Sequence, residues 1–169
     1  MKIKILTFIG LLSLATIMCG PSLNTIYFTE TEPDRKELVG KYYPTAETIN
    51  LIREDGTYEI SEKEEMVISI MTDGTFEMTN MPDWWLTNFG IPTGGFDSGK
   101  GQWHIVQQQS WWNVALKFES RENFSSKPGS GSLSTSIPIV GNEAPYSLWL
   151  YIGDPDSGTV MVFEQISDE

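Results

Sequence analysis

Apolar and polar residues alternate along much of the chain with a period of two, which is typical of β-strands. The segment Trp111–Glu119 is the clearest case, because Trp112, Val114, Leu116 and Phe118 all fall on one face. The opposite face of this segment is mostly polar. We therefore expect a strand that packs one side against a core.

A second local signal is the pattern Asp-Gly-Thr-aromatic-Glu, which begins at Asp55 and again at Asp73. Asp-Gly favours the positive-φ turn of a tight hairpin. The apolar run Met66–Met71 precedes the second copy, and Thr75–Thr79 alternates after it. The sequence therefore predicts a hairpin that turns at Asp73-Gly74.

Short helices are expected at two places between the strands. Thr45 can cap a helix over Ala46–Arg53, although the same residues also fit a strand. The segment Met81–Leu86 carries Pro82 and Asp83 where a first helical turn would begin.

The rest of the chain alternates between turn-rich loops and short strands. Loops are predicted at residues 90–101 and 120–132, which are rich in Gly and Ser. Further strands are predicted at residues 38–43, 102–107, 136–140, 146–152 and 159–165. Pro138 suggests that its strand lies at a sheet edge. The expected fold is mainly β, an antiparallel barrel or sandwich of seven to nine strands with one or two short helices.

The N-terminus has the form of a targeting segment. Ile5–Met18 is an apolar run of 14 residues that follows two lysines, too short to span a bilayer, for which about 20 residues are needed. We expect a signal peptide over residues 1–18, a lipidated tether over 19–36 and a β-domain over 37–169. Cleavage after Ala15 and an uncleaved anchor remain alternatives.

Charge limits the classes of partner. The chain has 11 Lys and Arg against 23 Asp and Glu, a net charge of −12. Loss of Lys2 and Lys4 with the signal would leave 9 against 23, or −14. Such a field repels nucleic acid and anionic lipid headgroups and would steer a basic protein. Solubility alone is the alternative explanation of the charge.

The sequence contains few residues or motifs that indicate a catalytic or metal site. One Cys and one His exclude a disulfide framework and a multi-His metal site. His104 is the sole candidate general base, and no nucleophile motif accompanies it. Asp154–Gly158 begins like a calcium loop but lacks the later ligands, so we read it as a turn. We expect no enzyme activity, no cofactor, no metal and no catalytic residue.

The six tryptophans are the one unusual enrichment. Neighbours in a strand face opposite sides, so one member of the pair Trp111-Trp112 should lie in the core and the other be exposed or covered by a loop. The tryptophans can be core packing or can line a ligand site. The candidate ligand-binding residues are Trp84, Trp85, Trp103, Trp112 and Trp149.

The expected location and role of the protein rest on resemblances to known bacterial proteins. The end of the apolar run at Cys19-Gly20 resembles a bacterial lipoprotein signal, which implies lipidation of Cys19. Gly40-Lys41-Tyr42, the hairpin at Asp73–Phe76 and Gly101-Gln102-Trp103 are similar to motifs of small lipocalin-like bacterial lipoproteins. The chain also looks like uncharacterised bacterial lipoproteins, in the motifs at residues 80–85 and 153–158.

These resemblances imply a place and a role. The place is the bacterial cell envelope, with the protein anchored in a membrane and facing the periplasm or the exterior. The role is a non-enzymatic binding or structural module, with a small apolar ligand as the first expectation. The alternative is an acidic lipoprotein that neutralises a basic envelope partner. Whether the barrel interior is filled or hollow should separate these hypotheses.

Overall fold

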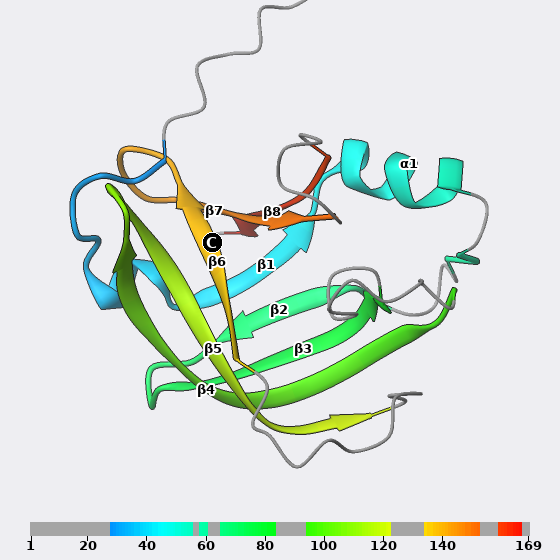
Figure 1. Cartoon of the computed structure of the whole chain (residues 1–169), viewed down its shortest axis with the longest axis horizontal. Helices are drawn as coiled ribbons and strands as arrows, with labels where there is room; N and C mark the ends of the chain where they lie inside the picture. The colour runs from blue at the N-terminus through cyan, green and yellow to red at the C-terminus, as the bar shows by residue number, and fades with distance from the viewer. Residues whose placement is uncertain are drawn as a thin grey trace, which may run out of the picture.

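The computed structural model describes residues 28–55, 58–60, 65–83, 94–122, 134–152 and 159–166. They form eight antiparallel strands that follow one another in chain order around a closed barrel, with β8 returning to pair with β1 (Figure 1). The strands are β1 (Gly40–Pro44), β2 (Val67–Ile70), β3 (Thr75–Pro82), β4 (Phe96–Gln108), β5 (Trp111–Glu122), β6 (Ser134–Val140), β7 (Ser147–Tyr151) and β8 (Val160–Ile166). The prediction of a small antiparallel β-barrel is confirmed.

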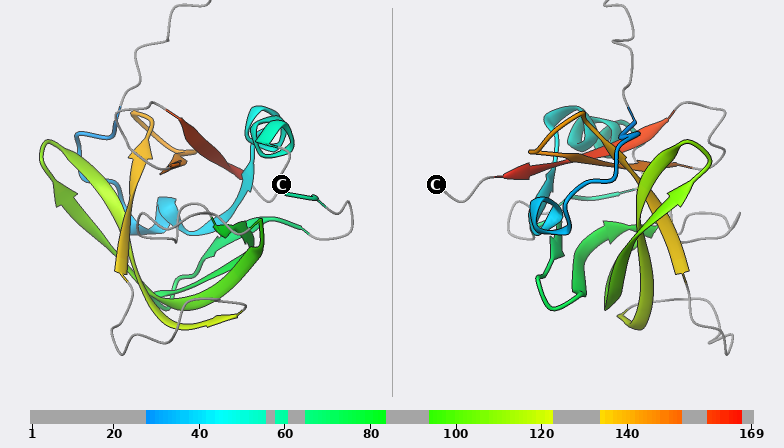
Figure 2. Two further views of the ribbon diagram at one scale, coloured as in Figure 1. Left: turned by 45° about the vertical axis from the view of Figure 1, so that its right-hand side comes forward. Right: turned by 90° about the vertical axis from the view of Figure 1, so that its left-hand side faces the viewer.

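The barrel has two different ends (Figure 2). The β2–β3, β4–β5 and β6–β7 turns lie at one of them with the 3₁₀-helix η1 (Arg35–Leu38), and we call it the hairpin end. At the other, the loop end, β1 leads into α1 (Ala46–Asp55). The helix begins as expected, since the Thr48 N–H donates to Thr45 Oγ1 at 3.2 Å. The Thr48 hydroxyl donates to the Val162 carbonyl oxygen and so links the helix to β8.

Every strand contributes buried apolar side chains to one continuous core. Ile68 and Ile70 of β2 are buried, whereas the alternate residues Val67 and Ser69 are only half-buried. This is the alternation that the sequence predicts for a sheet with one side against a core. Among the described residues, these side chains pack against one another in the interior of the barrel.

The hairpin predicted at Asp73-Gly74 is present. The Met71 N–H donates to the Thr75 carbonyl oxygen at 2.9 Å, and Gly74 adopts a φ of +91°. The Asp73 carboxylate accepts hydrogen bonds from the Thr75 N–H at 2.9 Å and from its hydroxyl at 2.6 Å. Local residue chemistry alone thus determines this turn.

The loop predicted at residues 90–101 is wrong in its second half, because β4 already begins at Phe96. The glycines that suggest a loop allow two strands to come unusually close. A Cβ on Gly101 would lie 2.0 Å from the Lys117 carbonyl oxygen, and one on Gly99 would lie 2.9 Å from the Phe118 ring. Glycine here permits a sharp bend of the barrel wall. The loop predicted at residues 120–132 also begins later, since β5 extends to Glu122.

The helix predicted over Met81–Leu86 is wrong at its start. Met81 and Pro82 are the last residues of β3 and pair with Asp97 and Phe96 of β4. A bulge between Met78 and Met81, with Asn80 at a φ of +52°, shifts the register of the β3–β4 ladder. Residues 84–86 lie outside the described part of the chain. Leu38, predicted to start a strand, instead ends η1.

Pro138 does not mark an edge strand, because β6 pairs with both of its neighbours. Its ladder with β7 contains only the pairs Ile139–Leu148 and Val140–Ser147. Pro138 lies just before this short ladder, where its missing N–H removes no hydrogen bond to β7.

Residues 28–30 lie against the barrel at the hairpin end. The Thr29 N–H donates to the Ile139 carbonyl oxygen at 3.0 Å, and the Trp112 N–H donates to the Thr29 carbonyl oxygen at 2.8 Å. Phe28 pairs with Val140. The segment is thus inserted between β5 and β6, so the ordered structure begins before the domain boundary expected at residue 37.

Candidate ligand-binding site

The three candidate tryptophans that the structure describes do not form one wall. Trp103 and Trp112 lie on the inward-facing positions of β4 and β5, in line with the buried Leu116 and Val114. Trp149 lies on the outer face of β7, because its neighbours Leu148 and Leu150 are the buried residues. Trp84 and Trp85 lie outside the described residues.

Trp103 is a packing residue of the hairpin end. Its side chain is 3% exposed, and its indole N–H donates to the Met71 carbonyl oxygen at 2.9 Å. The Arg35 guanidinium lies over its ring at 4.5 Å from the centroid. Such a cation–π contact further fixes the ring in place.

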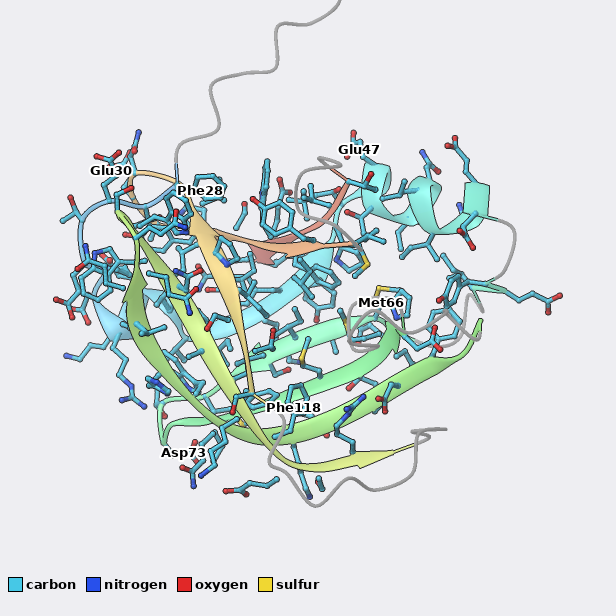
Figure 3. The ribbon with its side chains drawn as sticks, viewed as in Figure 1. Phe28, Glu30, Glu47, Met66, Asp73 and Phe118 are labelled. Carbon is cyan, nitrogen blue, oxygen red and sulfur yellow. The ribbon has the colours of Figure 1, made fainter. Side chains whose placement is uncertain are left out.

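An aromatic cluster covers the outside of the barrel where residues 28–30 enter it. The Phe28 ring, labelled in Figure 3, stacks on Trp111 with centroids 5.0 Å apart and meets Trp149 edge-on at 6.0 Å. The Trp112 indole donates to the Glu30 carbonyl oxygen at 3.2 Å. The expectation that one tryptophan of the pair faces the core and the other is covered is therefore confirmed, with Phe28 covering Trp111.

Ionised side chains are buried inside the loop end of the barrel. Asp97 of β4 is 2% exposed, and its Oδ2 accepts from Arg121 Nη2 at 2.5 Å and from Nε at 3.2 Å. Its other oxygen, Oδ1, is buried and has no hydrogen-bond partner among the described residues. An unpaired buried acceptor costs about 1–3 kcal/mol, so such an atom calls for an explanation.

Aromatic and acidic groups lie at the same end. The Tyr58 hydroxyl donates to the Asp83 carboxylate, which is 8% exposed. The Tyr58 ring meets Phe96 edge-on at 5.6 Å, and Phe118 lies 5.7 Å from the Arg121 guanidinium. We call Tyr58, Asp83, Phe96, Asp97 and Arg121 the loop-end cluster. It brings aromatic side chains together with buried carboxylates.

Sequence reasoning missed most of this cluster. Asp97 falls in the segment predicted as a loop, and 24 residues separate it from Arg121 in the chain. The one available signal is Asp83 beside Trp84 and Trp85, which the sequence places in the first turn of a predicted short helix. The alternation of Asp97, Gly99, Gly101 and Trp103 would have placed the carboxylate inward had the strand been recognised.

The remaining predictions concern metal and catalytic chemistry. His104 is exposed on β4. In the described ranges, no three His, Cys, Asp or Glu side chains lie close enough together to hold a metal ion. Cys19 and Asp154–Gly158 lie outside these ranges.

Comparison with protein-family models, with curated proteins and with solved structures finds no match to this chain. Its fold is an eight-stranded up-and-down barrel, which is compatible with a lipocalin-like fold. Among the described residues, no helix is long and apolar enough to cross a membrane.

Proposed function

We propose that this protein is a lipid-tethered, non-enzymatic barrel of the bacterial cell envelope that binds one small ligand at its loop end. The observation that carries the proposal is the buried Asp97–Arg121 ion pair with its unpartnered Oδ1. Barrels of eight strands are just wide enough to be filled or to hold one small ligand.

Stability alone is a poor reason for this ion pair. Replacing a buried ion pair by packed apolar residues is often neutral or stabilising, because each charge loses its hydration on burial. Most of the other buried side chains of the described residues are apolar. A ligand that donates one hydrogen bond to Asp97 Oδ1 would satisfy the acceptor that the protein leaves unpaired.

The ligand favoured by these groups has an apolar or aromatic body and one N–H or O–H donor. Phe96 and Tyr58 offer ring edges to the body, and Asp97 accepts from the donor. Trp84 and Trp85 follow Asp83 directly in the sequence, so they stay candidates for covering the ligand.

The experiment is a fluorescence titration with N-phenyl-1-naphthylamine, an apolar aromatic probe with one N–H donor. We use the full chain carrying Cys19→Ser, so that no acyl chain competes for the probe. Asp97→Asn and Phe96→Leu should weaken binding at least tenfold. Trp84→Ala and Trp85→Ala should weaken it while changing stability little.

Asp73→Asn is the matched control, because it removes an exposed carboxylate at the opposite end of the barrel. It should leave the affinity unchanged. Thermal unfolding of each variant separates lost binding from lost folding, and Phe96→Leu provides a test if Asp97→Asn unfolds. A native protein that binds no probe, with every Trp→Ala change severely destabilising, would contradict the proposal.

The acidic surface supports a second candidate, a basic protein partner. The ordered segment before β1 exposes Glu30, Glu32, Asp34 and Glu37. These carboxylates add to a net charge of −12, which would attract a cationic protein at low salt. Binding of a basic protein becomes the favoured function if the native protein binds no probe in the fluorescence titration.

A further inference from the structure

An open groove of about 490 Å³ lies on the outside of the barrel at the hairpin end. The turn residues Asp73 and Thr75 form one side of it. Trp103 and the outward-facing His104 of β4 contribute to the groove with Lys117 of β5. Figure 3 marks this place by Asp73, at the turn between β2 and β3.

Arg35 gives the groove a fixed positive charge. Its guanidinium lies over the Trp103 ring, and its Nη2 lies so close to Gly74 that a Cβ there would come within 2.8 Å. Trp103 is itself held by hydrogen bonds from its indole N–H to Met71 and from its backbone N–H to Gly74. The cation is thus positioned before any ligand arrives.

The donors of Arg35 are uncommitted. Within the described ranges the one ion pair is that of Arg121 with Asp97, and no side-chain hydrogen bond of Arg35 occurs there. A guanidinium whose flat face packs on a ring has its N–H groups pointing outward in the guanidinium plane, where they can bind a ligand. Two parallel N–H donors fit the oxygens of a carboxylate or a phosphate.

Two further donors line the same groove. Lys117 lies opposite Gln102 across the β4–β5 ladder, and His104 follows Gln102 on the same face, so the two are diagonal neighbours. Both are exposed, and neither pairs with a carboxylate in the part of the chain that the structure describes.

Two acidic groups near the groove, Glu119 and Asp73, already accept hydrogen bonds. Glu119 accepts a hydrogen bond from Gln102 at 2.9 Å rather than pairing with Lys117. Asp73 accepts from the Thr75 N–H and hydroxyl, and these hydrogen bonds hold the pKa of its carboxyl below the usual range. In a chain with 23 acidic residues, cations that converge without a carboxylate partner are unexpected.

We propose that this groove binds an oxyanion, a phosphate or carboxylate group, held by Arg35 and Lys117 with His104 as a further donor. The site is separate from the loop-end cluster, so either can fail without the other. A small phosphorylated molecule and a lipid headgroup present the same chemistry.

The test is an NMR titration of the full-length protein in neutral maltoside micelles with inorganic phosphate, at constant ionic strength set by chloride. We expect saturable shifts of the Gly74 and Thr75 amides and of the Trp103 indole. A second arm adds phosphatidylglycerol to the micelles. Shifts with free phosphate alone indicate a soluble ligand, and stronger shifts with the lipid indicate a headgroup.

Variants separate a built site from general charge. Arg35→Gln and Lys117→Gln should each weaken phosphate binding about tenfold. Lys36→Gln is the matched control, because it removes an exposed charge from the same 3₁₀-helix beside the groove and should change nothing. Lys117 is exposed on its strand, so its variant tests the proposal even if Arg35→Gln unfolds. No saturable shift with either anion source, or equal weakening by Lys36→Gln, would overturn it.

Discussion

Tyr42 carries a polar hydroxyl into the apolar core of the barrel. The residue is 0% exposed, and its hydroxyl donates to the Leu38 carbonyl oxygen at 2.9 Å. Burial, and to a smaller extent the nearby Tyr146, raise the pKa of Tyr42 well above its ordinary value of 10.0. One side chain thus joins β1 to the end of η1 and links stability to pH.

Tyr42 should make the protein sensitive to alkali. The folded state holds this proton more tightly than the unfolded state, in which the pKa is about 10. The contribution is therefore present below about pH 10 and is lost as pH rises through the higher folded-state pKa. Denaturant unfolding between pH 8 and 12 should show a falling free energy of unfolding.

In Tyr42→Phe this fall should be shallower. The variant should also lose about 1–3 kcal/mol at neutral pH, because the buried Leu38 carbonyl loses its donor. Tyr43→Phe, at a half-buried position of the same strand, is the control and should keep the slope of the native protein. Equal slopes in all three proteins would show that Tyr42 does not cause the alkaline loss.

At the scale of elements, the barrel wall bends where β4 and β5 run closest together. Gly101 and Gly99 face inward on β4, opposite Phe118 and Arg121 of β5. The two strands shift register between Lys100 and Gly101, and such a bulge increases the local bend and twist. Closure of the barrel therefore depends on the absence of a side chain at Gly99 and Gly101 as well as on the packing of larger residues.

Substitutions in β4 should rank by the atom that a new Cβ meets. Gly101→Ala places it against the backbone of Lys117, so we expect a loss of about 3 kcal/mol. Gly99→Ala meets the edge of the Phe118 ring, which can shift, and should cost less. The exposed Lys100→Ala should change stability by under about 0.5 kcal/mol. Urea unfolding measures the series, and equal values for Gly101→Ala and Lys100→Ala would contradict it.

Some of these elements were predictable because their cause is local. Asp73-Gly74 sets a turn by its own chemistry, and the alternation of Trp112, Val114 and Leu116 sets the strand face. The glycines of β4 were misread because their cause is a strand distant in sequence. The pairing of Asp97 with Arg121 likewise depends on contact between strands, so no local sequence pattern predicts it.

At the scale of the whole molecule, the path of the N-terminal segment determines how the barrel can be tethered. The described chain enters at Phe28, beside β6 at the hairpin end (Figure 3). Nine residue steps separate Cys19 from Phe28. Fully extended, they span at most about 30 Å. A lipid on Cys19 would therefore hold the hairpin end close to the membrane.

Cys19→Ser should release the protein from the membrane fraction into the soluble fraction. An acylated cysteine with more than one chain gives stable anchoring, and the substitution removes the attachment atom. Fractionation with immunoblotting measures the change, and mass spectrometry of the native N-terminus checks the modification. An unmodified mature protein that begins at Thr16 would show that the chain is secreted without a lipid.

The insertion of residues 28–30 between β5 and β6 also determines where mechanical load enters the fold. A pull on the N-terminal side of the chain would act first on the two backbone hydrogen bonds of Thr29 and on the stacked ring of Phe28. The longer ladders of β1 with β2 and β8 lie behind this contact and are loaded only after it yields. If the chain is tethered through its N-terminal side, residues 28–30 would therefore detach from β5 and β6 before the barrel opens.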